Sequence, residues 1–358
     1  EHALKARNKV IDRLFTFELL TPYQHQVMLA EPVQAGRRVL PQLTPLLARE
    51  LHQQAPFDAN INTYINQTLQ ADIDAVVARR LSRLSSNLSV AVMIMENQQG
   101  KVLAYKGSAD FNDLRRFGHV DMTKAVRSPG STLKPFIYAM AMRMGMKPCD
   151  KITGAGCIDL PTGGRWCPKG GGGSTYTMAK ALAGSVNSIA ATLISRFGPE
   201  PVIAMMRRMG VKSFIPMQYS ISLGACELSM YELVGAQASL VNHGLFIEPT
   251  FIMRVEDKNG NLIYEADPVI DQALEPEIAY ETVKLMKGVC DFGTAARIRS
   301  NPKFGKIPYP MAGKTGTTQN NTDGWFIGMT PELVTGVWVG ALDPTVRFST
   351  IANGQGAN

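Results

Sequence analysis

The chain has 358 residues, a net charge of +7 and a pI near 9.1, and 45% of its residues are hydrophobic. This length and composition fit a globular protein with a sizeable core. The chain has no run of eighteen apolar residues, so no segment is expected to span a membrane. The basic residues are scattered and form no dense run interleaved with aromatic residues, which argues against nucleic-acid binding. Because the sequence opens on Glu1 without a signal peptide, we interpret it as a fragment or a processed form.

Five cysteines are present, and three of them lie in a stretch rich in glycine and proline. These three, Cys149, Cys157 and Cys167, would allow one disulfide in an oxidising compartment. We favour the simpler interpretation that all five are free, small apolar residues. Spacings of eight and ten residues without a nearby histidine do not resemble a zinc site.

The first half of the chain predicts helices followed by a hairpin. Residues 3–32 read as helical, with a second helix start at Thr21-Pro22. Residues 36–56 contain three prolines and read as a connector, and residues 64–84 have helical periodicity. Residues 88–96 and 101–106 are rich in strand-forming residues and flank a turn, which predicts a β-hairpin.

The second half predicts a helical block and then strands. Helices are expected from Ser131 onward, over 177–197 with an interruption at 184–187, over 199–209 up to Gly210, and over 276–289. A second hairpin is expected between 251–255 and 262–264, around Asn259-Gly260. Three strands should end the chain, over 309–318, 324–329 and 334–342.

These elements predict an α+β fold. Two strands before the helical block and three after it can form one five-stranded antiparallel sheet flanked by helices.

The run Ser131-Thr132-Leu133-Lys134 places a hydroxyl and an amine three residues apart. On a helix this spacing puts both side chains on one face, and Ser131 would lie at the positive end of the helix dipole. A serine becomes a good nucleophile when a base takes its proton. Lysine can be that base if burial or a nearby cation lowers its pKa, and Lys314 is a candidate for that cation. The alternative is an exposed helix start with Lys134 in solvent.

The run Ser185-Val186-Asn187 is a weaker signal, because Ser85-Ser86-Asn87 has the same pattern. We assign the earlier copy to a loop, since no glycine precedes it. At Ser185 a helix is interrupted after Gly184, which would present two polar side chains to a cleft. There Ser185 could relay a proton from Lys134 to a leaving amine, and Asn187 could bind an amide. The alternative is a simple turn.

The run Lys314-Thr315-Gly316 falls in a predicted strand. Lys314 and Thr315 suit a substrate carboxylate, and Gly316 would let substrate backbone approach closely. The N–H groups of Ser131 and Thr317 are candidates for an oxyanion hole.

The sequence also offers two rival sites. Gly313-Lys314-Thr315 resembles the end of a phosphate-binding loop, but Pro308 stands where that loop requires glycine. A Ser-His-Asp triad using His243 stays open on chain order, and His119 lies nearest to Ser131 in sequence. Such a triad would leave three motifs unexplained.

Together and in this order, the three motifs resemble the S-x-x-K, S-x-N and K-T-G set of penicillin-binding proteins and serine β-lactamases. Residues 127–135, 313–318 and 323–328 are similar to class A penicillin-binding proteins, and the similarity covers about 60–358. Weaker similarity at 6–32 is to the end of a glycosyltransferase domain. Its acidic catalytic motifs are absent, so glycan polymerisation is not expected.

The resemblance implies a transpeptidase that cross-links peptidoglycan stem peptides and is acylated by β-lactams. It implies Ser131 as nucleophile, Lys134 as base and Ser185 as proton relay. Asn187 and residues 314–317 would bind substrate. No metal or organic cofactor is implied, and no nucleic acid. Stem peptides, β-lactams and cell-wall synthesis proteins are the expected partners. The expected location is the periplasmic face of the inner membrane, with an anchor outside this chain.

The resemblance also implies a domain division. Residues 1–58 would be the end of a glycosyltransferase domain and a linker, and residues 59–358 the transpeptidase domain with a helical cluster carrying the first two motifs. The family's C-terminal helix is expected to be missing. Two functional alternatives remain open: a D,D-carboxypeptidase or β-lactamase on the same fold, and a non-catalytic β-lactam sensor or scaffold.

Overall fold

The computed structural model describes residues 2–33, 43–56, 58–82, 84, 87–161, 163–170, 172–300, 307, 309–318, 321–343 and 345–348. The chain divides into two compact units, Glu1–Gln42 and Leu43–Asn358. Among the described residues, no helix combines the length and the apolar character that crossing a membrane requires.

The first unit is a pair of helices, α1 (His2–Thr16) and α2 (Pro22–Ala30). The predicted helix start at Thr21-Pro22 is confirmed. The Thr21 side chain accepts from the Gln24 N–H, and the Gln24 side chain accepts from the Thr21 N–H, which satisfies two N–H groups at the helix end. Asp12 Oδ1 lies 2.8 Å from His25 Nε2 and links the two helices.

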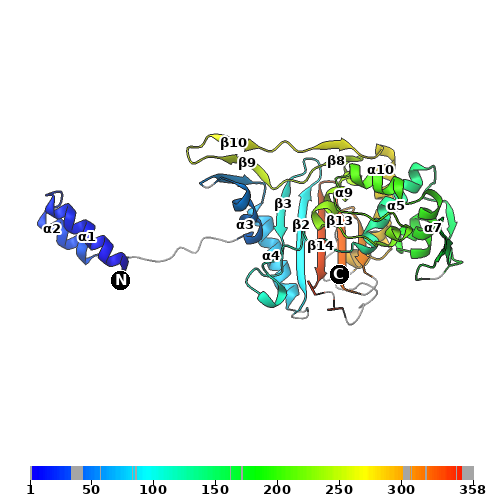
Figure 1. Cartoon of the computed structure of the whole chain (residues 1–358), viewed down its shortest axis with the longest axis horizontal. Coiled ribbons are helices and arrows are strands. Elements are labelled where there is room, and N and C mark those ends of the chain that lie inside the picture. Colours follow the sequence, from blue (N-terminus) through cyan, green and yellow to red (C-terminus); the bar gives the residue numbers. More distant parts are fainter. Residues whose placement is uncertain are drawn as a thin grey trace. The chain divides into compact units, whose positions relative to one another are not determined.

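The second unit is built on a five-stranded antiparallel sheet in the order β12-β13-β14-β2-β3 (Figure 1), as predicted. Its strands are β2 (Ser89–Glu96), β3 (Val102–Lys106), β12 (Ala312–Thr317), β13 (Asp323–Met329) and β14 (Leu333–Gly340). Strands from the two ends of the sequence pair directly, because β14 lies between β13 and β2. β12 is an edge strand, so one side of it is available to elements outside the sheet.

Helices cover both faces of the sheet, and the alternation along β2 explains how. Val90 and Val92 pack with Ile73 and Val77 of α4 (Gln67–Leu81). The intervening residues, including Met93, belong to the main core on the other face. A strand whose successive side chains point to opposite faces can be buried on both sides only if both faces are covered.

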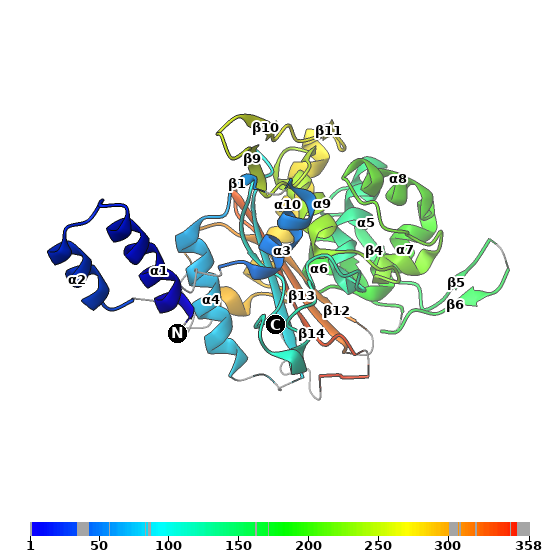
Figure 2. The ribbon, with the colours of Figure 1, turned by 60° about the vertical axis from the view of Figure 1, so that its left-hand side comes forward.

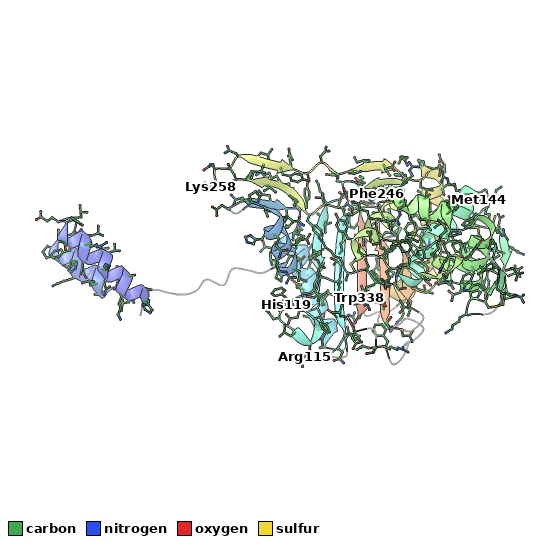
Figure 3. All side chains as sticks on the ribbon, in the orientation of Figure 1. Arg115, His119, Met144, Phe246, Lys258 and Trp338 are labelled. Carbon is green, nitrogen blue, oxygen red and sulfur yellow. A yellow bond between two sulfur atoms is a disulfide. The ribbon has the colours of Figure 1, made fainter. Side chains whose placement is uncertain are left out.

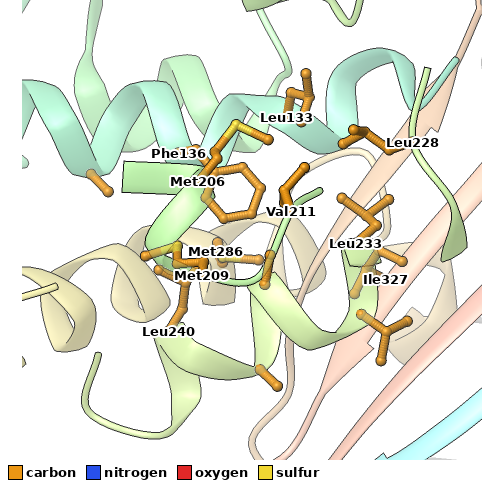
Figure 4. Close-up of a cluster of buried hydrophobic side chains, with 14 of the residues drawn as sticks. Leu133, Phe136, Met206, Met209, Val211, Leu228, Leu233, Leu240, Met286 and Ile327 are labelled. Atoms are coloured by element: carbon orange, nitrogen blue, oxygen red, sulfur yellow. The ribbon is translucent and has the colours of Figure 1, made fainter. Parts of the chain in front are cut away.

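The main core joins the sheet to α5 (Lys134–Arg143), α9 (Met230–Val241) and α10 (Pro276–Asp291). Figure 4 shows its centre, where Leu133 and Phe136 lie beside Met206 and Val211, and Ile327 comes from the sheet. The other helical elements of the second unit are α3 (Pro45–Gln54), α6 (Met178–Ala183), α7 (Asn187–Phe197), α8 (Glu200–Arg208), α11 (Arg297–Ser300), and the 3-10 turns η1 (Leu114–Arg116), η2 (Gly130–Leu133) and η3 (Tyr219–Leu223).

Small sheets complete the unit. β1 (Asn60–Thr63) pairs with β9 (Ile252–Glu256), which also pairs with β10 (Leu262–Glu265) in the predicted hairpin. The remaining strands form two-stranded sheets: β4 (Lys151–Thr153) with β7 (Thr175–Thr177), β5 (Ile158–Asp159) with β6 (Arg165–Trp166), and β8 (Leu245–Ile247) with β11 (Ile270–Gln272).

Two expectations were wrong. The predicted connector over 36–56 contains α3, which begins after Thr44 and buries Leu46, Leu47 and Leu51. Proline at the first helical position favours a helix start, so Pro45 begins a helix here. Residues 36–42 of that connector lie outside the described residues, as do residues 349–358.

The favoured interpretation that all cysteines are free is also wrong. Cys157 and Cys167 form a disulfide, whereas Cys149, Cys226 and Cys290 are free. The β5–β6 hairpin turns the chain back on itself and brings the two cysteines together. A two-residue strand is too short to have been predicted from its pattern, so this pairing could not be read from the sequence.

Candidate active site

The candidate nucleophile lies in a tight turn at the start of a helix. Ser131 is the second residue of η2, and Lys134 is the first residue of α5. The helix start predicted at Ser131 therefore begins as a 3-10 turn. Ser131 is half-buried and Lys134 is fully buried. The Ser131 N–H has no partner inside the turn, because the first N–H groups of a helix have no acceptor one turn earlier in the same helix.

This turn packs against the edge strand β12. Gly130 has φ +53°, and a Cβ there would lie 2.8 Å from the Thr317 carbonyl oxygen. At Gly316 a Cβ would lie 2.6 Å from the Pro129 carbonyl oxygen and 2.8 Å from a Thr132 methyl. We predicted that Gly316 lets substrate backbone approach, and in the fold its missing side chain leaves room for the nucleophile turn. Two glycines therefore let the first and third motifs come into contact.

Lys134 points toward the second motif. Its Nζ donates to the Ser185 carbonyl at 2.5 Å and to Asn187 Oδ1 at 2.7 Å, and lies 3.2 Å from Ser185 Oγ. Within the described residues the Ser131 hydroxyl has no hydrogen-bond partner, so it is free to receive a substrate. The alternative of a solvated Lys134 on an exposed helix face is wrong.

Ser185 lies in the predicted break between α6 and α7, with φ +55°. This left-handed backbone turns its side chain to the two lysines. Lys314 Nζ donates to Ser185 Oγ at 2.9 Å and to the Thr315 carbonyl at 3.0 Å. The Ser185 hydroxyl thus bridges Lys134 and Lys314, which lie 180 positions apart in the sequence.

Burial makes both lysines unusually acidic. Desolvation lowers the pKa of Lys314 to about 7, and desolvation together with the Lys314 charge lowers the pKa of Lys134 well below its ordinary value. A buried site disfavours the charged form, and a second cation disfavours it further. The first condition for a lysine base, a depressed pKa, is therefore met.

We expect this pKa shift to appear as a pH dependence of stability. Between pH 7 and 10.5 the unfolded chain carries a proton on Lys314 that the folded chain lacks, so the free energy of unfolding should rise with pH across this window. From pH 7 to pH 10, the free energy of unfolding of the wild type should rise by on the order of a few kcal/mol more than that of Lys314→Met. Urea denaturation of both proteins at a series of pH values measures this, and parallel curves would contradict it.

The third motif has a hydroxyl partner that the sequence did not indicate. Thr315 Oγ1 lies 2.6 Å from Thr294 Oγ1, in the segment after α10. The Thr294 N–H donates to the Ala183 carbonyl at the end of α6. Thr294 therefore joins the third motif to the helix that precedes Ser185, and no pattern around it in the sequence predicted this.

Gln237 is a second residue that we did not anticipate. It is fully buried in α9 and its Nε2 donates to the Thr132 carbonyl at 2.9 Å, which fixes the nucleophile turn from behind. Gln237 is the single amide side chain of α9, and this was the available signal, because a buried polar side chain needs a partner.

A mostly buried ion pair fixes the segment leading into the turn. Arg127 Nε donates to Asp323 Oδ1 at 2.8 Å, and Trp338 Nε1 donates to the same oxygen at 3.0 Å. Figure 3 shows Trp338 within the sheet. Next along the chain, the Ser128 carbonyl accepts from Trp325 Nε1 at 2.9 Å. The nucleophile turn is thereby tied to β13 and β14.

Removing the charge of Asp323 should be costly. Asp323→Asn leaves Arg127 buried without its anion, and the free energy of unfolding should fall by about 3 kcal/mol. Asp271→Asn is the matched control, because its pair with Arg208 is exposed and should change stability by about 0–1 kcal/mol. Urea denaturation compares them, and equal losses would show that burial of the pair does not matter.

The histidine alternatives are not assembled. Among the described residues neither His119 nor His243 hydrogen-bonds Ser131. The His119 carbonyl accepts from Arg49, and its ring packs on Phe111. The His243 carbonyl accepts from Gln272. Ser85 and Ser86 of the second S-x-N copy lie outside the described residues.

A family model described as the penicillin-binding protein transpeptidase domain matches residues 90–343, a range that includes all three motifs. The chain belongs to this family. The resemblance predicted from the motifs is therefore confirmed, as is the α+β fold.

Within the described residues, no cluster of three or more histidine, cysteine, aspartate or glutamate side chains is arranged to hold a metal ion.

Relatives and solved structures agree with this assignment. Penicillin-binding protein 1C of Escherichia coli (strain K12) is 28% identical over 355 residues, covering 96% of this chain and 43% of that protein. Penicillin-binding protein 1A of Neisseria lactamica is 34% identical over 266 residues, covering 71% and 32%. This chain thus spans less than half the length of these curated relatives.

Two solved structures show the shared fold. Penicillin-binding protein 1A from Haemophilus influenzae gives a TM-score of 0.76 at 18% identity, covering 96% of this chain and 72% of that one. PonA1 from Mycobacterium tuberculosis in complex with penicillin V gives 0.69 at 23% identity, covering 94% and 85%.

Proposed function

We propose that this chain is a peptidoglycan D,D-transpeptidase that works through a serine acyl-enzyme on Ser131. The observation that carries the proposal is the buried cluster in which Ser185 joins Lys134 to Lys314, directly behind the nucleophile turn. A purely structural core would not bury two lysines without a carboxylate partner, because each buried charge is costly. Such a cluster suits a site whose base must be a neutral amine.

The base is Lys134. A neutral amine has two N–H groups and one lone pair, and two acceptors already face its Nζ, the Ser185 carbonyl and Asn187 Oδ1. Ser185 Oγ lies farther away, at 3.2 Å from Nζ, and in this proposal the lone pair takes the Ser131 proton. As Ser131 Oγ bonds to the carbonyl carbon of the penultimate D-Ala, its proton passes to Lys134. The N–H groups of Ser131 and Thr317 would stabilise the oxyanion.

Collapse of the tetrahedral intermediate breaks the C–N bond to the terminal D-Ala. Ser185 passes a proton from Lys134 to the leaving nitrogen, and it is placed for this because its hydroxyl contacts both lysines. Lys314 and Thr315 receive the terminal carboxylate, and Asn187 binds the donor amide. An amine of a neighbouring stem then attacks the ester carbonyl and gives a proton to Lys134. The ester C–O bond breaks, Lys134 returns the proton to Ser131 Oγ, and the cross-link is formed with Ser131 restored.

A β-lactam enters the same route as an acyl donor whose leaving group stays attached. In this proposal stem peptides and β-lactams are the ligands, and cell-wall synthesis proteins are the expected partners. The location that fits these substrates is the periplasmic side of the inner membrane. Residues 59–358 form the transpeptidase domain in this proposal, and residues 1–58 the end of a glycosyltransferase domain with its linker.

Fluorescent penicillin tests the proposal. The native protein should form a stable adduct that survives denaturing electrophoresis and is blocked by unlabelled penicillin, and heat-denatured protein should not. Stem peptides with an added amine should then yield the cross-linked dimer. Rapid loss of the adduct would instead indicate a β-lactamase, release of D-Ala without a dimer a carboxypeptidase, and a stable adduct without turnover a sensor. Absence of labelling would contradict the site assignment.

A further inference from the structure

The disulfide lies next to the second motif. Cys157–Cys167 closes the β5–β6 hairpin, which has only two residue pairs, Ile158 with Trp166 and Asp159 with Arg165. Figure 2 shows the hairpin projecting beyond α7, the helix whose first residue is Asn187. A hairpin this short is not stable by itself in water, so the covalent link determines its conformation.

The base of the hairpin is attached to α7, because the Ala155 N–H donates to Thr192 Oγ1 of that helix at 2.9 Å. The Gly154 N–H donates to the Ser174 carbonyl of the segment that returns from the hairpin. A Cβ at Gly154 would lie 2.3 Å from Ser188 Oγ, so backbone lies directly on the start of the helix. The incoming strand of the hairpin is therefore held on α7 independently of the disulfide.

The outgoing strand reaches the catalytic cluster. Two residues after Cys167, the Lys169 carbonyl accepts from Asn187 Nδ2 at 3.2 Å. Gly170 follows, and a Cβ there would lie 3.8 Å from Asn187 Cβ. The disulfide is the covalent link between the anchored incoming strand and this returning segment.

This contact fixes which way the Asn187 amide faces. With Nδ2 on the Lys169 carbonyl, Oδ1 must face Lys134, where it accepts at 2.7 Å. A flipped amide would present N–H groups to the amine and compete for the lone pair that takes the Ser131 proton. Without a carbonyl at Lys169, nothing among the described contacts of Nδ2 opposes that flip.

We propose that the Cys157–Cys167 disulfide is a positioning element of the active site, which acts through the Lys169 carbonyl to keep the Asn187 amide in the orientation that the base Lys134 requires. The inference rests on the proposed function. If it holds, the rate of Ser131 acylation depends on whether Cys157 and Cys167 are oxidised to the disulfide, although the hairpin does not touch the reacting atoms.

A double-mutant cycle tests it. The second-order rate constant for acylation by fluorescent penicillin is measured for the wild type, Cys157→Ser/Cys167→Ser, Asn187→Ala and the triple variant. Loss of the disulfide should slow acylation about tenfold with Asn187 present. In the Asn187→Ala background, loss of the disulfide should change the acylation rate by less than about twofold, because the contact of Asn187 with the Lys169 carbonyl is already absent.

Two outcomes would overturn the inference: an unchanged rate without the disulfide, or an equal loss in both backgrounds, which would indicate general loosening of the fold. Cys149→Ser, which removes a free and exposed thiol, should leave the rate unchanged. If the double serine variant does not fold, the folded protein is reduced with a phosphine and alkylated, and the two 187 backgrounds are compared in the same way. Oxidised wild type that is never labelled contradicts the proposed function itself.

Discussion

Replacing Ser131 by alanine is expected to abolish covalent labelling by penicillin completely. Ser131 lies in the nucleophile turn, three residues before Lys134 and next to Gly130, which packs against the edge strand β12. Without Oγ no ester can form, so the loss is absolute and does not depend on dose or time. Denaturing electrophoresis after saturating exposure to fluorescent penicillin measures it.

The fold should survive this change. Ser131 is half-buried and its hydroxyl has no hydrogen-bond partner among the described residues, so the free energy of unfolding should shift by less than about 0.5 kcal/mol. Ser82→Ala, at an exposed serine after α4, is the matched control and should label like the wild type. Residual labelling of Ser131→Ala would place the nucleophile elsewhere in the chain.

Replacing Lys134 by methionine should slow acylation by a factor on the order of 10²–10⁴, the usual contribution of a positioned base. Methionine keeps much of the volume of the lysine stem in a fully buried position, so the core should stay packed. In the wild type the rate should rise with pH as Lys134 loses its proton. Its pKa is lowered by burial and by Lys314, so the rise should come below the ordinary lysine range.

Stopped-flow acylation across pH measures this effect for Lys134→Met and for the control Lys147→Met, an exposed lysine between α5 and β4. The control should reproduce the wild-type rate and pH profile. The Lys134→Met variant should be acylated slowly, and its acylation rate should not rise with pH. If the variant kept the wild-type profile, another group would be the base, and Lys314 would be the first candidate because it donates to the same Ser185 hydroxyl.

The sequence by itself determined the layout of the fold to a large extent. The hairpin at 88–106, the break at 184–187 and the three terminal strands follow from local patterns, and each was confirmed within a few residues. Local patterns suffice there because turn residues and alternation act within a few residues of each other. The order of the three motifs likewise identified the family.

The contacts between distant segments became visible only in the folded chain. The approach of the nucleophile turn to Gly316, the roles of Gln237 and Thr294, and the helix α3 inside an expected connector all depend on packing. The prediction that the cysteines are free was wrong for the same reason, because the pairing of Cys157 with Cys167 depends on the fold. A side chain's partners are set by which elements meet in space, and sequence spacing carries no record of that.

The three motifs show this division most clearly. Their residue types and order indicated acyl transfer by a serine with a lysine base. The sequence left open whether Lys134 was buried, whether Lys314 came near it, and which way Asn187 faced. Burial of both lysines around Ser185 settles the first two, and the Lys169 carbonyl settles the third. An amine's pKa depends on its surroundings, and only the fold supplies those surroundings.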